Sequence, residues 1–333
     1  MSTTKYFYEL TVSSSPHCHG PLTTRRIMLD VVLALCLPLA GGVYFFGLRA
    51  LFLALVSVGA CVFFEWGYRK LMHKDGTWQD LSAVVTGLLL ALVCPPTVPF
   101  WVLIVGDLFA IVVVKQLYGG IGKNFMNPAL AGRAFLMFSW PAAMSTWAAP
   151  VRRVMTWIPA DAVTAATPLS ALHAGTLPET SLTDLLWGNV GGCIGETSAV
   201  LLLLGAAYLV VRRVISLRIP LCYLGTVAVL AFLFPQGNER LAWTAYELLS
   251  GGLLLGAFFM ATDYVTTPVT KWGQAIFGIG CGVITIAIRY FGAIPEGVSF
   301  SILVMNACVV LLDRVGRPKK YGYQKPKKEG KAA

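Results

Sequence analysis

Residues 27–46 read IMLDVVLALCLPLAGGVYFF, and this stretch sets the class of fold. Its only charged side chain is Asp30, which lies close to the start. An α-helix of this length is about 30 Å long, which equals the thickness of the hydrocarbon core of a bilayer. The stretch therefore predicts a helix that crosses a membrane.

The composition of the whole chain extends this prediction. Of its 333 residues, 56% are hydrophobic and 13% are charged, whereas a soluble domain is about 25% charged. These values exclude the disordered, collagen-like and ordinary soluble classes. Because a helix satisfies its own backbone hydrogen bonds in lipid, they predict an all-α polytopic membrane protein.

Ten apolar runs follow one another along the chain, and several are shorter than a straight span requires. Gly and Pro interrupt them, which is tolerated where the backbone lines a site enclosed by protein and is typical of transporters with broken helices. We expect about ten transmembrane helices, some short or broken. The runs are Ile27–Phe46, Leu48–Phe64, Leu81–Cys94, Val98–Val114, Pro128–Trp140, Gly191–Val211, Pro220–Phe234, Ala242–Met260, Gln274–Arg289 and Gly297–Leu312.

The distribution of basic residues predicts the orientation. If ten spans alternate from a cytoplasmic N-terminus, 20 of the 26 Lys and Arg residues lie on the cytoplasmic side and five lie outside. Basic residues favour cytoplasmic loops, so both termini are expected in the cytoplasm. The resulting segments are a cytoplasmic N-terminal segment (1–26), a first transmembrane half (27–140), an external loop (141–190), a second transmembrane half (191–312) and a basic cytoplasmic tail (313–333). The tail lies next to the bilayer, where it favours contact with anionic lipid over nucleic acid.

Two pairs of strings resemble each other across the two halves. TGLLLA at 86–91 resembles GGLLLG at 251–256, and MNPA at 126–129 resembles MNA at 305–307. An inverted repeat of five plus five spans, with a site at its interface, explains these pairs. Chance is the alternative, because Leu and Gly are common in this chain.

The cysteine pattern predicts no metal centre. The eight Cys residues are scattered singly, without a CxxC pair, so no iron–sulfur or zinc site is expected from this chain alone. The triplet His17-Cys18-His19 cannot complete a tetrahedral site by itself.

The most specific string lies in the expected external loop, where residues 161–169 read DAVTAATPL. A turn of small residues before Pro168 is the simplest interpretation. The string also resembles a flavinylation motif, in which a flavin transferase joins the phosphate of FMN to the last Thr. In this sequence Asp161, Thr164 and Ala166 belong to the motif and Thr167 is the attachment residue. Small neighbours leave room for a bulky ring, and the Thr hydroxyl supplies the oxygen of the phosphoester.

Further motifs extend the resemblance from about residue 5 to residue 315. They read SPH (15–17), TRRIMLD (24–30), GGIGKNFMNPA (119–129), GETS (195–198) and ATDYVTTP (261–268). Together they resemble the RnfD/NqrB family, and the Rnf branch more closely, because the NqrB branch has a longer N-terminal region.

The resemblance implies a role in an Rnf complex of the bacterial cytoplasmic (inner) membrane. Such a complex couples electron transfer between ferredoxin and NAD to translocation of sodium ions or protons, which makes it an oxidoreductase and a translocase. Thr167 would carry covalent FMN on the periplasmic or external side, and a non-covalent riboflavin is expected nearer the inner side. The implied partners are the other Rnf subunits, with their flavins and iron–sulfur centres, and the flavin transferase.

Two further groups of residues are candidates for function. The loop 119–129 is rich in Gly, and Asn124 and Asn127 add polar groups to it, so it lines a ligand or forms a tight turn. The carboxylates Asp107, Glu196 and Glu247 lie in or near apolar spans, where charge is costly. They form an ion path, or they are structural ion pairs with Arg133 or with partner subunits.

Two rival functions remain open from the sequence. A stand-alone channel or carrier for a small solute or ion would also have short, broken spans, but it does not require the string at 161–167. A subunit of the NqrB type in a sodium-pumping quinone reductase would share the motifs, but would have a longer N-terminal region.

Overall fold

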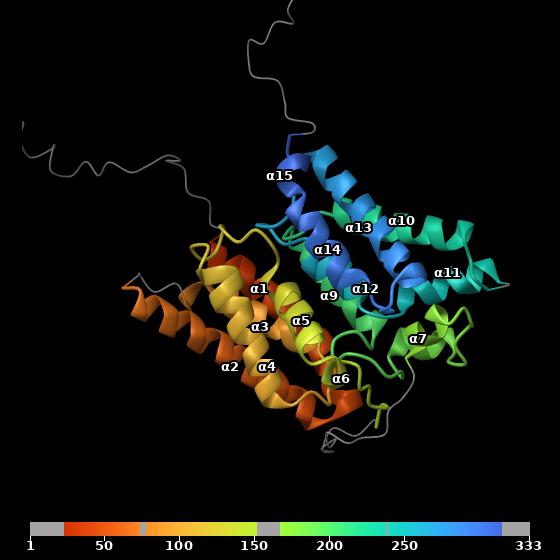
Figure 1. The fold of residues 1–333 in the computed structure, drawn as a ribbon, viewed down its shortest axis with the longest axis horizontal. Helices are drawn as coiled ribbons and strands as arrows, with labels where there is room; N and C mark the ends of the chain where they lie inside the picture. Colours follow the sequence, from red (N-terminus) through yellow and green to blue (C-terminus); the bar gives the residue numbers. More distant parts are fainter. Residues whose placement is uncertain (1–22, 74–77, 152–166, 238, 315–333) are drawn as a thin grey trace, which may run out of the picture.

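The computed structural model describes residues 23–73, 78–151, 167–237 and 239–314, and these residues form helices and loops without a β-strand (Figure 1). The helices of the first half surround α5, and those of the second half surround α14 (Figure 1). The all-α class predicted from the composition is therefore confirmed.

Helices of the first half are α1 (Thr24–Phe46), α2 (Leu48–Leu71), η1 (Trp78–Asp80), α3 (Ser82–Leu92), α4 (Phe100–Leu108), the π-helix η2 (Phe109–Gln116) and α5 (Pro128–Ser139). Three short helices connect the halves: α6 (Pro141–Met144), α7 (Pro168–His173) and α8 (Leu182–Trp187). The second half has α9 (Ala199–Val211), α10 (Arg218–Leu233), α11 (Arg240–Leu249), α12 (Leu253–Leu255), the π-helix η3 (Gly256–Met260), α13 (Lys271–Phe291), α14 (Val298–Ala307) and α15 (Val309–Leu312).

Each of the ten apolar runs contains at least one of these helices. Among the described helices, α1, α2 and α13 are long and apolar enough to cross a membrane by themselves, and α11 with α12–η3 passes the same test as a pair bent by 61°. Four shorter apolar helices are α3, α9, α10 and α14. The prediction of helical spans is confirmed, while the number of ten crossings stays a prediction.

One run differs from its prediction. Residues 191–198 were expected to open a span, but they form a loop and α9 begins only at Ala199. The backbone of this loop pairs with the end of α3, since Gly195 N donates to Leu92 O at 2.8 Å and Ile194 N donates to Cys94 O at 3.2 Å. A Cβ on Gly195 would lie 2.7 Å from the Leu92 side chain, so only glycine permits this approach.

The ends of several helices follow from local sequence. Asn127 caps α5, because its Oδ1 accepts from Ala129 N at 3.0 Å, and Pro128 occupies the first turn, where its missing N–H costs nothing. Between α11 and α12, Gly251 has a φ of 68°, which breaks the helix and produces the bend.

Both halves contribute to one apolar core. At its centre α5 and α14 pack side by side and antiparallel. The ring of Phe138 at the end of α5 lies 5.5 Å from that of Phe300 near the start of α14. At the other end Asn127 N donates to the side-chain oxygen of Asn306 at 3.1 Å when that amide faces it. An inverted repeat would place its two fifth helices in this way.

Candidate functional site

Two cavities lie at opposite ends of α5. Ala129 at the start of α5 lines the first, together with Asn124 and Asn127, and we call it the Asn127 cavity. Met137 near the end of α5 lines the second, together with Thr167, and we call it the Thr167 cavity. They contain about 800 and 1080 Å³ of space that no atom occupies, which is the size class of small-molecule sites.

The predicted attachment residue, Thr167, is half-buried and lies where α7 begins. Its Oγ1 accepts a hydrogen bond from Ser170 N at 3.2 Å, and Pro168 follows as the first residue of the helix. The wall of the cavity around Thr167 is largely apolar and includes Trp147, Leu249 and Ile294. The other motif residues, Asp161, Thr164 and Ala166, lie outside the described residues.

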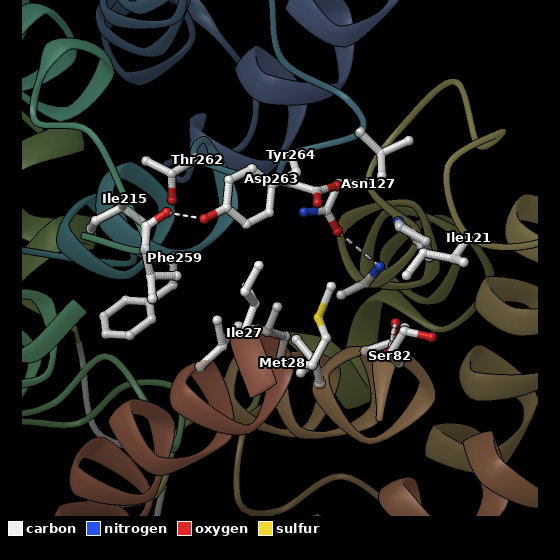
Figure 2. A pocket seen from close by; sticks show the side chains of 18 of the residues that line it. Ile27, Met28, Ser82, Ile121, Asn127, Ile215, Phe259, Thr262, Asp263 and Tyr264 are labelled. Carbon is white, nitrogen blue, oxygen red and sulfur yellow. Dashed lines mark hydrogen bonds between the residues drawn. The ribbon is translucent and has the colours of Figure 1, made fainter. Parts of the chain in front are cut away.

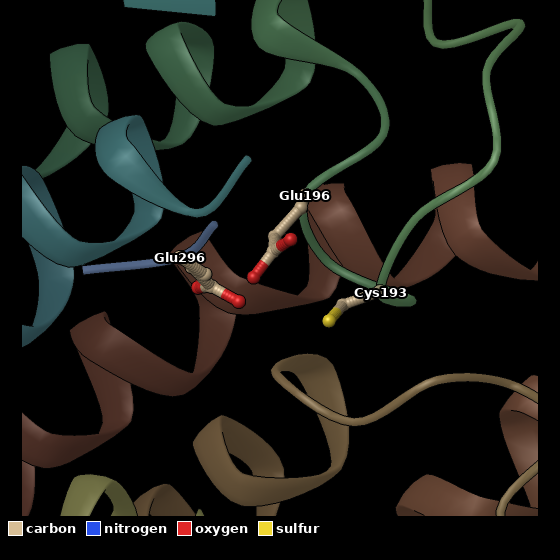
Figure 3. Close-up of side chains that lie close together, drawn as sticks. All are labelled: Cys193, Glu196 and Glu296. Atoms are coloured by element: carbon tan, nitrogen blue, oxygen red, sulfur yellow. The ribbon is translucent and has the colours of Figure 1, made fainter. Parts of the chain in front are cut away.

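A buried ionic cluster forms part of the wall of the Thr167 cavity. Arg133 Nη1, from α5, donates to Glu296 Oε1 at 2.8 Å and to Glu196 Oε1 at 3.2 Å. Arg133 Nη2 donates to Glu296 Oε2 and contacts Cys193 Sγ at 3.5 Å. Figure 3 shows the side chains of Cys193, Glu196 and Glu296 converging from two segments.

The geometry of this cluster does not suit a metal ion. The ligand atoms of Cys193, Glu196 and Glu296 lie within 4.8 Å of one another. However, the Arg133 guanidinium donates hydrogen bonds to both carboxylates, so a positive charge already occupies the position between them. The cluster is a charge-paired network rather than a set of metal ligands.

Glu296 was not singled out in the sequence analysis, although it completes this cluster. The available signal was weak: a lone carboxylate in the string IPEG, next to the apolar run that begins at Gly297. Its partner Arg133 lies 163 residues away along the chain, and no local pattern links the two positions.

The structure brings Asn124 and Asn127 into one cavity (Figure 2). Both side chains are buried. Asn127 Nδ2 donates to Met260 O at 3.3 Å, and Asn124 Nδ2 donates to Met126 O at 3.2 Å. Phe259, Thr262 and Asp263 line the same cavity. The predicted ligand-lining loop therefore does border a cavity, and its amides also hold the turn together.

The predicted ion-path residue Asp107 is fully buried on α4. Its Oδ1 accepts from Ser57 Oγ at 2.6 Å and from Cys61 Sγ at 3.2 Å. Its Oδ2 has no hydrogen-bond partner, and no ion pair involves Asp107 in the described part of the chain.

Glu247, on α11, pairs with Arg289 of α13. Arg289 Nη1 donates to Glu247 Oε2 at 2.5 Å and to Glu247 O at 2.6 Å, while Nη2 donates to Ser250 O at 3.0 Å. Asp107, Glu196 and Glu247 thus have different hydrogen-bond partners and belong to three separate clusters. The ion path through them stays a prediction, and the Arg partners of Glu196 and Glu247 match the structural alternative.

The sequence analysis also missed a pair close to the Asn127 cavity. Lys115, which lines this cavity, donates to Glu65 Oε2 at 3.0 Å and to Ser82 Oγ at 2.6 Å. Gln116 Nε2 donates to the other oxygen of Glu65 at 2.8 Å. The signal was a carboxylate one residue beyond the run that ends at Phe64.

Broken apolar helices, buried ion pairs and a cavity at each end of a central helix define a polytopic membrane protein with a transporter-like architecture. Comparison with known proteins then identifies the family. The chain belongs to the family described as NQR2, RnfD, RnfE, which residues 11–322 match.

Individual relatives cover nearly the whole chain, and each is the RnfD component of its complex. The chain is 48% identical to that of the Na(+)-translocating ferredoxin:NAD(+) oxidoreductase complex of Acetobacterium woodii, over 97% of this chain and 98% of the relative. It is 41% identical to that of the proton-translocating ferredoxin:NAD(+) oxidoreductase complex of Clostridium ljungdahlii, over 94% and 96%. The counterpart from the ion-translocating oxidoreductase complex of Stutzerimonas stutzeri is 40% identical, over 89% and 92%.

Proposed function

We propose that this chain is the RnfD component of an ion-translocating ferredoxin:NAD oxidoreductase complex and that it relays electrons through FMN attached covalently to Thr167. The names of the relatives, and their coverage of both chains, support the first part. They also favour the Rnf branch over a subunit of the NqrB type and over a stand-alone channel.

The observation that carries the second part is the position of Thr167 on a large apolar cavity. The cavity offers about 1080 Å³ and includes the aromatic side chain of Trp147, which suits a flat, largely apolar ring system. The Ser170 N–H that points at Thr167 Oγ1 is a donor beside the attachment atom. FMN would supply the redox chemistry, while the chain would fix its position and surroundings.

A second flavin, riboflavin, is proposed for the Asn127 cavity. This cavity combines apolar walls, including Phe259, with a few polar groups such as Asn124 and Lys115. Apolar walls with a few placed polar groups are typical of small-molecule sites. No attachment residue is required, because riboflavin lacks the phosphate.

The remaining parts of the proposal concern the membrane and the ion. Thr167 is placed on the external side of the bacterial inner membrane, which the excess of basic residues in the predicted cytoplasmic segments supports. Other subunits are expected to cover exposed apolar side chains such as Phe291. Asp107, Glu196 and Glu247 remain candidates for the ion path. The relatives are named for sodium in one case and protons in another.

The test is covalent flavin on a denaturing gel. The chain, expressed with its flavin transferase, should give a fluorescent band that disappears in Thr167→Ala. Thr176→Ala is the matched control, because Thr176 lies just beyond α7 and is exposed. A dark wild-type band, or a Thr167→Ala band that still fluoresces, would refute the attachment.

A further inference from the structure

The cluster beside the Thr167 cavity carries unequal charge. Two carboxylates, Glu196 and Glu296, share the single guanidinium of Arg133 at 3.2 and 2.8 Å. Within the described part of the chain, Arg133 is the only cation that pairs with either carboxylate. With all three groups ionised, the cluster would therefore have a net charge of −1.

Burial makes this excess charge costly. The side chains of Arg133, Glu196 and Glu296 are 3%, 6% and 9% exposed. Two buried carboxylates a few ångströms apart repel each other, and a site of this kind commonly retains a proton on one of them.

The groups around the cluster do not supply the missing positive charge. The thiol of Cys193 lies 3.5 Å from Arg133 Nη2, and the thiol of Cys94 also faces the guanidinium. Arg289 approaches the nearby Gly251, but is paired with Glu247. A neutral thiol and a completed ion pair leave the charge of the cluster unchanged.

Two independent features point to a small occupant beside the carboxylates. Ser250 lines the same cavity, is 2% exposed, and its Oγ has no hydrogen-bond partner. The neighbouring Gly252 leaves open a position that a Cβ would fill, only 2.6 Å from Glu196 Oε1 and 3.0 Å from Glu296 Oε1. The two carboxylates and this unpaired hydroxyl all line the cavity.

We propose that Glu196 and Glu296 form a proton-binding site that holds one exchangeable proton, taken up from the Thr167 cavity. One carboxylate gains the proton and becomes a neutral acid, while the other stays ionised and keeps its bond to Arg133. A sodium ion fits less well, because the guanidinium would repel it and a thiol replaces one of the oxygen ligands it prefers.

The proton site has a consequence that rests on the proposed function. An electron that arrives in the Thr167 cavity adds one negative charge beside the cluster, and uptake of one proton cancels that charge. The site itself is inferred from the residues of this chain and does not require a flavin.

Infrared difference spectroscopy of the purified complex tests the site. The wild type should show the C=O stretching band of a buried carboxylic acid, which shifts in D₂O. This band should be lost in Glu296→Gln and also in Glu196→Gln, because a single remaining carboxylate pairs one-to-one with Arg133 and stays ionised. Glu179→Gln is the matched control, since Glu179 is exposed in the same connecting segment, and it should retain the band.

A second variant covers the case in which the Gln substitutions prevent folding. Gly252→Ala adds a methyl group next to both carboxylates and should shift or abolish the band. A wild type without the band, a band that survives both Gln substitutions, or a band unchanged in Gly252→Ala would overturn the proposal. Loss of the band on adding sodium at constant pH would replace the proton with a sodium ion.

Measurement of the same band in Thr167→Ala separates the two proposals. If the band persists while covalent flavin is absent from the wild type, only the attachment fails. If flavin is attached and the band is missing, only the proton site fails.

Discussion

Replacement of Arg289 by Met should destabilise the chain strongly. The Arg289 side chain is 2% exposed, and it donates to the Glu247 carboxylate and to the carbonyls of Glu247 and Ser250. Met preserves much of the volume but leaves a buried carboxylate without its cation. Breaking a buried pair by removing one partner costs about 3–5 kcal/mol.

The double variant Arg289→Met/Glu247→Gln isolates the ionic part of this loss. It removes both charges together, so the penalty of an uncompensated carboxylate disappears and only the hydrogen bonds to the two carbonyls are lost. Each of these bonds contributes about 1 kcal/mol. We therefore expect the double variant to be more stable than Arg289→Met by about 1–3 kcal/mol.

The assay is unfolding of the purified chain in mild detergent, followed by the fluorescence of its nine Trp residues. Arg240→Met is the matched control, because Arg240 is exposed at the start of α11, and it should change the free energy of unfolding by less than about 0.5 kcal/mol. If Arg289→Met unfolds like Arg240→Met, or if the double variant is less stable than the single one, the buried pair does not act as described.

Three further variants test other parts of the structure. Gly87→Ala in α3 should cost about 1–3 kcal/mol, because the new Cβ would lie 2.8 Å from the Ser57 carbonyl oxygen, whereas Gly67→Ala in α2 meets open space and should be neutral or stabilising by up to about 1 kcal/mol; equal effects on unfolding would contradict the close contact. Asp107→Asn should lower the number of ions moved per electron in reconstituted vesicles, and an unchanged ratio at normal electron flux removes Asp107 from the ion path. Asn127→Ala should cost about 1 kcal/mol through loss of the α5 cap and should release non-covalent flavin; retention of the flavin after gel filtration would argue against the Asn127 cavity as its site.

Much of the helical architecture follows from the sequence alone. The long apolar run at residues 27–46 and the later runs each contain helix, because a continuous apolar segment can satisfy its backbone only by internal hydrogen bonds. The run from Gly191 is the exception, since its first eight residues pair with the end of α3. That pairing depends on Leu92 and Cys94, which lie about a hundred residues away and leave no mark on the local hydropathy.

The candidate site divides in the same way. The string 161–167 indicated Thr167 from local sequence, and the Gly-rich loop indicated Asn124 and Asn127, because small and polar residues within an apolar chain are conspicuous. The structure added the cavities themselves and the partners of the buried charges. Glu296 and Glu65 were missed because a lone carboxylate at the edge of an apolar run does not reveal which cation it meets.

Local sequence is enough to say where the helices lie, which connecting segments carry the positive charge, and which threonine matches an attachment motif. These features depend on composition and spacing within a few turns of the chain. The meeting of Arg133 with Glu196 and Glu296 is instead a property of the tertiary structure, because residues from three distant segments converge there. Burial, distance and charge balance at that point depend on how α5 and α14 pack, and the packing of two helices cannot be read from either helix alone.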